Sequence, residues 1–282
     1  MAVTAKETAQ PGVQAPQNTR WWTGPFAIAA LVYVAITVTH GILSLIACQG
    51  HFVYAVDDAY IALAMAKNLA LHGVWGVTRY GFSGSSSSIL FPLLTAGIFR
   101  VVGVSVYVPL VISWVAGLLS ILVAARMLAR FVSRTWQTLL LVLLVICAPL
   151  FVIGVIGMEH TLHLLFTLLF LEIFLREDDL PAWRAALITA LMVSARYEGL
   201  FFVAPACLLL LVQRRWKLLI AVAAGAALPV AAYAWFSVAH GSYWLPQSVA
   251  LKGAHAKTGS AWESIRGVLQ RVLSNSRVGI WL

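Results

Sequence analysis

The chain has 282 residues, of which 61% are hydrophobic and 10% are charged, and its mean hydropathy is +0.90. A soluble domain of this composition would expose too much apolar surface, so soluble globular classes are excluded and an all-α polytopic membrane protein is predicted. The net charge of +9 does not indicate a nucleic-acid partner, because Lys and Arg lie mostly between apolar runs, where membrane topology explains them.

Three parts are expected along the chain. Residues 1–24 are polar and lack the features of a signal peptide, which predicts a disordered cytoplasmic tail. Residues 25–239 form the predicted transmembrane module, with an outer loop at 49–106 that contains juxtamembrane helices. Residues 240–282 are expected to be an outer-face loop and a basic amphipathic helix on lipid headgroups, at which the module is truncated.

Basic residues set the predicted orientation of the spans. The clusters of Lys and Arg belong in the cytoplasm together with the N-terminus. They reach it only if the segment around Pro92 and Arg100 stays at the outer face and if 182–212 crosses twice. The sequence therefore predicts about seven transmembrane helices. The apolar segments are 25–48, 86–104, 107–127, 137–157, 160–175, 182–195, 199–212 and 217–239, and the basic clusters are 126–134, 176–184 and 214–217.

Adjacent carboxylates follow the first span, in the stretch "FVYAVDDAYIALAMAKNLALHGVWG". Apolar residues then recur every fourth position up to Gly73, which predicts an amphipathic helix on the membrane surface. One aspartate is expected as the N-cap of this helix. A helix needs no second cap, so the other carboxylate is free to act as a general base. We expect Asp57 as the base and Asp58 as the cap or helper.

A charged break interrupts the segment 182–212 at "ARYEG". Arg196 and Glu198 are costly in hydrocarbon and belong at an aqueous surface or in a cavity. A salt bridge between them that only stabilises the break is one interpretation. The other is a functional site, because a guanidinium there can hold a phosphate with two parallel hydrogen bonds.

Other motifs fall on the predicted outer face. The loop "RYGFSGSSSSILFPLL" either shapes a substrate pocket or is a plain linker. In "GMEHTLHLLF", Glu159 and His160 either cap a helix start or line a cavity, and His163 is expected to be a hydrogen-bonded interior residue. Lys252 in "YWLPQSVALKGAH" is either a second outer-face cation of the site or a loose surface lysine. The three cysteines share no ligand-like spacing and are expected to be packing residues, so no metal site is predicted.

A carboxylate base beside cations suits the displacement of a phosphate leaving group by a hydroxyl nucleophile. The base takes the proton of the acceptor, and the cations stabilise charge on the departing phosphate. With one base and no second nucleophile, displacement at a sugar would invert the anomeric centre.

The order of these motifs resembles the GT-C superfamily of membrane glycosyltransferases, and most closely its arabinofuranosyltransferase-type members. The resemblance rests on "DDAYIALAMAKNLALHG", "GFSGSSSSILFPLL", "GMEH", "ARYEG" and "LPQSVALKG", and it covers about residues 25–255. It implies that Asp57 and Asp58 are the acidic motif of the first outer loop and that Arg196 lies near a lipid phosphate. Tyr60, Glu159, His160, Glu198 and Lys252 are the other expected substrate-binding residues.

The resemblance also implies the partners. A polyprenyl-phosphate monosaccharide would be the donor, a cell-envelope glycan, lipid or protein the acceptor, and the periplasmic side of the bacterial inner membrane the location. No cofactor is expected with certainty, and the need for a divalent metal is left open. A transporter or flippase of a lipid-linked anion is the alternative, since it also suits an Arg at a broken helix. A third possibility is an inactive fragment that scaffolds other membrane proteins.

Overall fold

The computed structural model describes residues 24–148, 150–175 and 181–244. Within these residues all regular secondary structure is helical, as predicted. The elements are α1 (Pro25–Ala47), α2 (Asp57–His72), α3 (Leu90–Val102), α4 (Tyr107–Leu128), α5 (Arg134–Cys147), α6 (Leu150–Val155), α7 (His160–Phe174), α8 (Ala182–Ala195), the 3-10 turn η1 (Tyr197–Gly199), α9 (Leu200–Val212) and α10 (Trp216–Ala239).

Helices α1, α4 and α10 are long and apolar enough to cross a bilayer, with 23, 22 and 24 residues. The chain is therefore a membrane protein by the length and composition of these helices. Five further apolar segments of the described residues have helices of 10–17 residues and α6 has six, so helix length alone does not reach the predicted count of about seven spans.

Two breaks in the chain account for the short lengths of α5, α6, α8 and α9. The segment 137–157 was expected as one span, but the structure divides it into α5 and α6 between Cys147 and Leu150. The sequence carries a proline between these residues, and proline cannot donate the backbone hydrogen bond that continues a helix. The break at 195–199 was predicted, and it separates α8 from α9 through η1.

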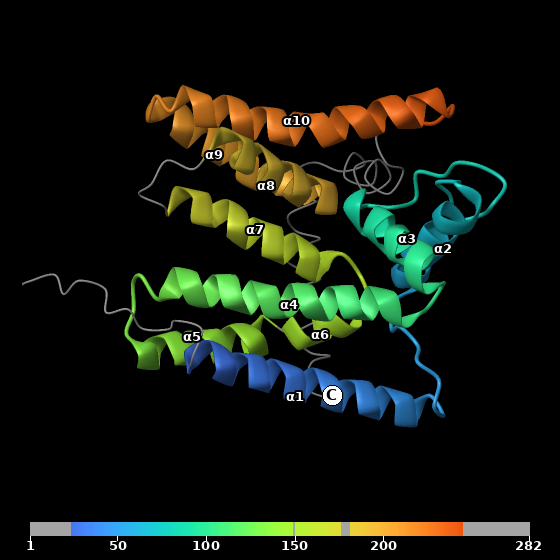
Figure 1. The fold of residues 1–282 in the computed structure, drawn as a ribbon, viewed down its shortest axis with the longest axis horizontal. Helices are drawn as coiled ribbons and strands as arrows, with labels where there is room; N and C mark the ends of the chain where they lie inside the picture. The colour runs from blue at the N-terminus through green and yellow to red at the C-terminus, as the bar shows by residue number, and fades with distance from the viewer. Residues whose placement is uncertain (1–23, 149, 176–180, 245–282) are drawn as a thin grey trace, which may run out of the picture.

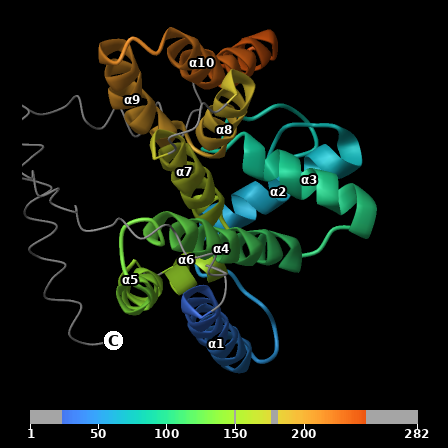
Figure 2. The same cartoon turned by 60° about the vertical axis from the view of Figure 1, so that its left-hand side comes forward.

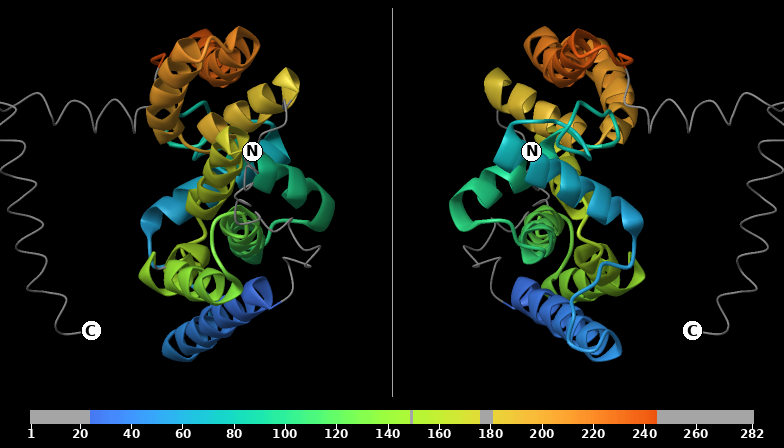
Figure 3. Two further views of the ribbon diagram at one scale, coloured as in Figure 1. Left: turned by 90° about the vertical axis from the view of Figure 1, so that its left-hand side faces the viewer. Right: turned by 90° about the vertical axis from the view of Figure 1, so that its right-hand side faces the viewer.

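The long axes of the helices run side by side, and Figure 1 shows them stacked from α1 at the bottom, through α4, α7 and α8, to α10 at the top. Figure 3 views the stack roughly along the helix axes, with α1 (blue) at the bottom and α10 (orange) at the top. Helix α7 is central, since it packs against α4 on one side and α8 on the other. In Figure 2, α9 diverges from α8, and α10 packs against both.

Consecutive helices alternate in direction, so the turns gather at two ends of the bundle. Helices α2 and α3 pack on one another at one end, on the right in Figure 1. The start of α7, the break between α8 and α9, and the end of α10 lie at the same end. We call this the α2–α3 end. The start of α5 and the turn from α9 to α10 lie at the other end and carry Arg134, Arg214, Arg215 and Lys217.

A buried ion pair ties α4 to α7 at the opposite end. Arg126 forms an ion pair with Glu172, and Arg130 lies 3.5 Å from the same carboxylate. The Glu172 side chain is only 5% exposed. Arg130 also donates a 2.7 Å hydrogen bond to the carbonyl of Leu175 at the end of α7. The arginine side chains are 37% exposed, so the buried charge is that of Glu172, and loss of its arginine partners would leave that charge uncompensated, which favours a fixed α4–α7 contact.

Candidate functional site

Helix α2 begins at the two aspartates, but neither of them is its N-cap. The N-cap is Val56, whose extended backbone (φ −125°, ψ 134°) leads the chain into the helix, and no side chain caps it. The prediction of an aspartate N-cap was therefore wrong, because both residues already lie inside the first turn. Asp57 Oδ1 accepts a 3.0 Å hydrogen bond from the Asp58 backbone N–H. Both carboxylates remain exposed, at the helix end where the macrodipole favours negative charge.

The loop before α2 is fixed by tyrosines. The backbone N–H of Tyr54 donates a 2.9 Å hydrogen bond to the Tyr60 hydroxyl, and the Tyr54 hydroxyl donates to the carbonyl of Val106. Burial raises the pKa of the Tyr54 phenol, so it stays a neutral donor. Tyr60, which was expected to bind substrate, is therefore a hydrogen-bond partner of this loop, with a ring that is 40% exposed.

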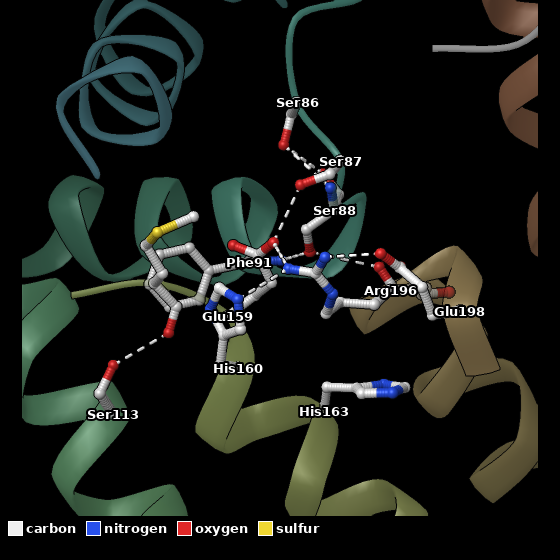
Figure 4. A network of polar contacts seen from close by, with 12 residues as sticks. Ser86, Ser87, Ser88, Phe91, Ser113, Glu159, His160, His163, Arg196 and Glu198 are labelled. Carbon is white, nitrogen blue, oxygen red and sulfur yellow. Dashed lines mark hydrogen bonds and ion pairs between the residues drawn. The ribbon is translucent and has the colours of Figure 1, made fainter. Parts of the chain in front are cut away.

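A tight turn positions Glu159 at the start of α7. Gly157 has a φ of +71°, and a Cβ atom there would lie 2.1 Å from the Tyr54 ring, so only glycine fits. The next residue, Met158, accepts a 3.1 Å hydrogen bond from Ser113 of α4 through its carbonyl. Glu159 follows as the N-cap residue of α7 without a side-chain capping bond. Its side chain is turned toward the α8–α9 break instead, as Figure 4 shows.

Arg196 lies between two carboxylates and a histidine (Figure 4). Its Nη1 donates to Glu159 Oε1 at 2.7 Å, and its Nη2 donates to Glu198 Oε1 at 2.6 Å. The Glu159 side chain is 3% exposed, whereas that of Glu198 is 50% exposed. The sequence predicted the pair with Glu198 as one interpretation. It did not predict the buried pair with Glu159, which joins α7 to the end of α8.

His160 accepts from the same guanidinium, because its Nε2 lies 3.2 Å from Arg196 Nη1 and arginine can only donate. This contact assigns the neutral imidazole with its proton on Nδ1. His160 Nδ1 is buried without a hydrogen-bond partner among the described residues. His163 lies one turn further along α7, with its Nδ1 3.4 Å from the carbonyl of Met192, as expected of a hydrogen-bonded interior histidine.

Opposing effects act on Glu198. Burial alone would raise its pKa, but the hydrogen bond and the charge of Arg196 outweigh burial and hold the pKa below its usual value. The carboxylate is thus ionised at neutral pH and pairs with Arg196 as an anion.

The serine loop contributes directly to this site. Ser87 Oγ donates a 2.9 Å hydrogen bond to Glu159 Oε1, the oxygen that Arg196 also contacts. The loop is held against the end of α8, because Ile89 N–H and Ser88 Oγ both donate to the Ser194 carbonyl, at 2.9 and 3.3 Å. The loop is therefore a packed wall of the site and not a plain linker.

A small cavity of about 90 Å³ lies between Asp58 and this network. Asp58 lies on one wall and Glu159 on another. The lining residues are Asp58, Ile61, Ala62, Ser85, Ser86, Ser87, Met158 and Glu159. Asp58, and not Asp57, thus lines the same cavity as the carboxylate that holds Arg196.

The remaining expected site residue, Lys252, lies outside the described residues, as does the predicted helix at 260–282. No group of three or more His, Cys, Asp and Glu residues that could hold a metal occurs in the described part of the chain. The described cysteines, Cys48, Cys147 and Cys207, are all unpaired.

Another cavity lies far from Asp58, Glu159 and Arg196. It has a volume of about 600 Å³ and lies at the opposite end of the bundle, lined by Pro181, Ala182 and residues 214–218. Its cations belong to the basic cluster 214–217, whose cytoplasmic position is a prediction from the sequence. The smaller cavity holds the convergent polar groups and is therefore the candidate site.

Comparison with known proteins adds no relative. No protein-family model, no curated protein and no solved structure matches this chain.

Proposed function

We propose that the chain is an inverting glycosyltransferase that transfers a monosaccharide from a polyprenyl-phosphate donor to a cell-envelope acceptor. The observation that carries the proposal is the cavity at the α2–α3 end, which Asp58 and Glu159 line together while Arg196 pairs with Glu159. A carboxylate available as a base and a guanidinium able to hold a phosphate thus lie at one end of the bundle.

In the proposed reaction, Asp58 removes the proton of the acceptor hydroxyl. The acceptor oxygen attacks the anomeric carbon as the bond from that carbon to the phosphate oxygen breaks, and the electron pair leaves with the polyprenyl phosphate. Arg196 stabilises the growing negative charge on this leaving group. Glu159 is a positioning residue, because it fixes Nη1 of the guanidinium through a buried ion pair.

Asp58 is a better base than Asp57 by its position. Asp57 uses one carboxylate oxygen to accept the Asp58 backbone N–H, whereas Asp58 lines the cavity. The proposal therefore exchanges the roles that were expected from the sequence. Lys252 is retained as a proposed second phosphate ligand.

We also propose a membrane topology for the helices. Helices α1, α4, α7, α8, α9 and α10 and the α5–α6 pair would make about seven crossings, with short helices accommodated by tilting or by local thinning of the bilayer. The basic residues at the opposite end would face the cytoplasm, and the α2–α3 end would face the periplasm. With Cys48, Cys147 and Cys207 replaced by Ser, attachment of a membrane-impermeant maleimide to the variants Arg79→Cys and Trp136→Cys tests this orientation, with labelling from the periplasmic side expected for Arg79→Cys only.

The activity is tested with purified protein in detergent and a set of radiolabelled polyprenyl-phosphate sugars. Transfer with inversion of the anomeric configuration, read by NMR of the product, is the expected result. Retention of configuration, or transfer that does not depend on Arg196, would contradict the proposed mechanism.

A transporter of lipid-linked anions is the second candidate, and one observation favours it. Helix α7 carries a buried acid–arginine pair at both ends, Glu159 with Arg196 and Glu172 with Arg126. Charged pairs at both ends of a helix would suit gates that open alternately. Movement of a fluorescent polyprenyl phosphate across reconstituted vesicles without sugar transfer would support this candidate over the first.

A further inference from the structure

The two ends of the Arg196 guanidinium have unequal partners. Nη1 is held by Glu159, which is 3% exposed and also accepts a hydrogen bond from Ser87. Nη2 is held by Glu198, which is 50% exposed. The Arg196 side chain itself is 14% exposed, so the guanidinium meets solvent at a limited opening. The buried partner is therefore fixed, and the exposed partner is the one that can exchange.

The backbone places Glu198 beside Arg196. It lies two residues after Arg196, in the turn η1 that follows the extended backbone of Arg196 (φ −157°, ψ 139°). Within the described part of the chain, the only ion pair of the Glu198 carboxylate is the one with this neighbouring arginine. Half-exposed pairs of this kind contribute little to stability, so a side-chain rotation that frees Nη2 is inexpensive.

The charges around Arg196 determine when an anionic ligand can bind there. Arg196 carries one positive charge against the two negative charges of Glu159 and Glu198, and the exposed Asp57 and Asp58 add more negative charge at the same end. An anionic ligand therefore meets a site of net negative charge while Glu198 is in place. Once Glu198 leaves, the anion can form a charge-assisted hydrogen bond with Nη2 in its stead.

We propose that the Glu198 carboxylate occupies the position that an oxyanion of the ligand takes on Arg196 Nη2, and that it leaves when the ligand binds. The inference rests on the proposed function for the ligand class, which is the phosphate of a lipid. Glu198 is then a specificity-determining residue. A neutral lipid cannot replace an ionised carboxylate on a guanidinium, whereas a phosphate can, so the exchange admits anions only.

Binding of decyl phosphate to the full chain in detergent, followed by isothermal titration calorimetry, tests the exchange. Glu198→Gln removes the competing charge and is expected to tighten binding about two- to fivefold, the range expected for loss of a weak exposed pair. Glu198→Asp keeps the charge and is expected to bind as the wild type or less than twofold tighter. Decanol, the neutral probe, should show no difference between the wild type and Glu198→Gln.

Variants of the arginine locate the site. Arg196→Gln is expected to weaken decyl phosphate binding at least tenfold, and Arg196→Lys, which keeps the charge without the second nitrogen, should remove the effect of Glu198→Gln. Lys67→Gln on the exposed face of α2 is the matched control for loss of a cation and should leave binding unchanged. The melting temperature of each variant shows whether it is folded.

Unchanged or weaker binding by Glu198→Gln would overturn the inference, as would wild-type affinity in Arg196→Gln. These results are separable from the proposed enzyme activity. Tighter binding by Glu198→Gln in a protein that transfers no sugar would support the exchange and contradict the glycosyltransferase. Sugar transfer by a protein in which Glu198→Gln does not tighten the binding of decyl phosphate would support the glycosyltransferase and contradict the exchange.

Discussion

Replacement of Glu159 by Gln removes the buried half of the Arg196 network while keeping the shape of the side chain. Loss of one partner from a buried ion pair typically costs about 3–5 kcal/mol, because the other charge stays buried without compensation. Arg196 keeps Glu198 and is 14% exposed, so we expect a smaller loss, about 2 kcal/mol. For a chain of this size that corresponds to a fall of about 4–8 °C in melting temperature.

The assay is thermal unfolding of the purified protein in detergent at one scan rate, followed by circular dichroism. Glu198→Gln is the matched control, because it removes the exposed carboxylate from the same guanidinium and should cost about 0–1 kcal/mol. The double variant Glu159→Gln with Arg196→Gln should be more stable than the sum of the single effects predicts, since it leaves no unpaired charge. Equal effects of the two single glutamine variants would refute the assignment of Glu159 as the fixed partner.

Three further variants test the surroundings of this pair. Gly157→Ala should lower the melting temperature by about 5 °C or more and reduce the yield of folded protein, because the backbone has positive φ and the methyl group would meet Tyr54. Ser87→Ala should lower the rate of transfer severalfold while costing only about 1 kcal/mol of stability, since it removes one hydrogen bond from Glu159. The pKa of Glu198 is lowered by its arginine partner, so this pair should stabilise the fold fully above about pH 4.3 and lose its effect as the pH falls through the lowered value, as measured by the melting-temperature difference between wild type and Glu198→Gln.

Each of these expectations has a result that would count against it. Gly41, where an added methyl group would have nothing within 4 Å and where φ is not positive, provides the control for the glycine variant. Equal melting temperatures of Gly41→Ala and Gly157→Ala would contradict the proposed steric role. A wild-type transfer rate after Ser87→Ala would remove the serine loop from the site. A pH-independent difference for Glu198→Gln would mean that the pKa of Glu198 is the same in the folded and unfolded protein, and would contradict a pKa lowered by Arg196.

Helix positions were largely predictable because each depends on a local apolar run. The expected segments at 25–48, 107–127 and 217–239 are α1, α4 and α10 within a few residues. The break between α5 and α6 was missed because the apolar run was judged by its overall hydrophobicity, although the proline between Cys147 and Leu150 is a local signal that a helix stops. Helices shorter than a bilayer's width likewise could not be judged by composition, which is why the number of crossings stays a proposal.

Three of the expected site residues lie close together in the structure, but the pairing between them was not predicted. The sequence placed Asp58, Glu159 and Arg196 at one end of the bundle, because topology fixes which turns share a face. The ion pair between Glu159 and Arg196 depends on how α7 packs against α8, and no local pattern encodes it. The sequence signal for this ion pair was that Glu159 and Arg196 carry opposite charges and lie on two turns at the same end of the bundle. The role of Val56 as the N-cap of α2 was missed because capping preferences favour aspartate, while the backbone enters the helix one residue earlier.

In the proposed reaction the carboxylate of Asp58 acts as the base in sugar transfer. The most direct test is the single-turnover rate of transfer from a polyprenyl-phosphate sugar by purified Asp58→Asn, compared with Asp57→Asn as the neighbouring control. We expect a fall of about 10²-fold or more for Asp58→Asn and a fall of less than about tenfold for Asp57→Asn. Transfer by Asp58→Asn at the wild-type rate would contradict this proposal.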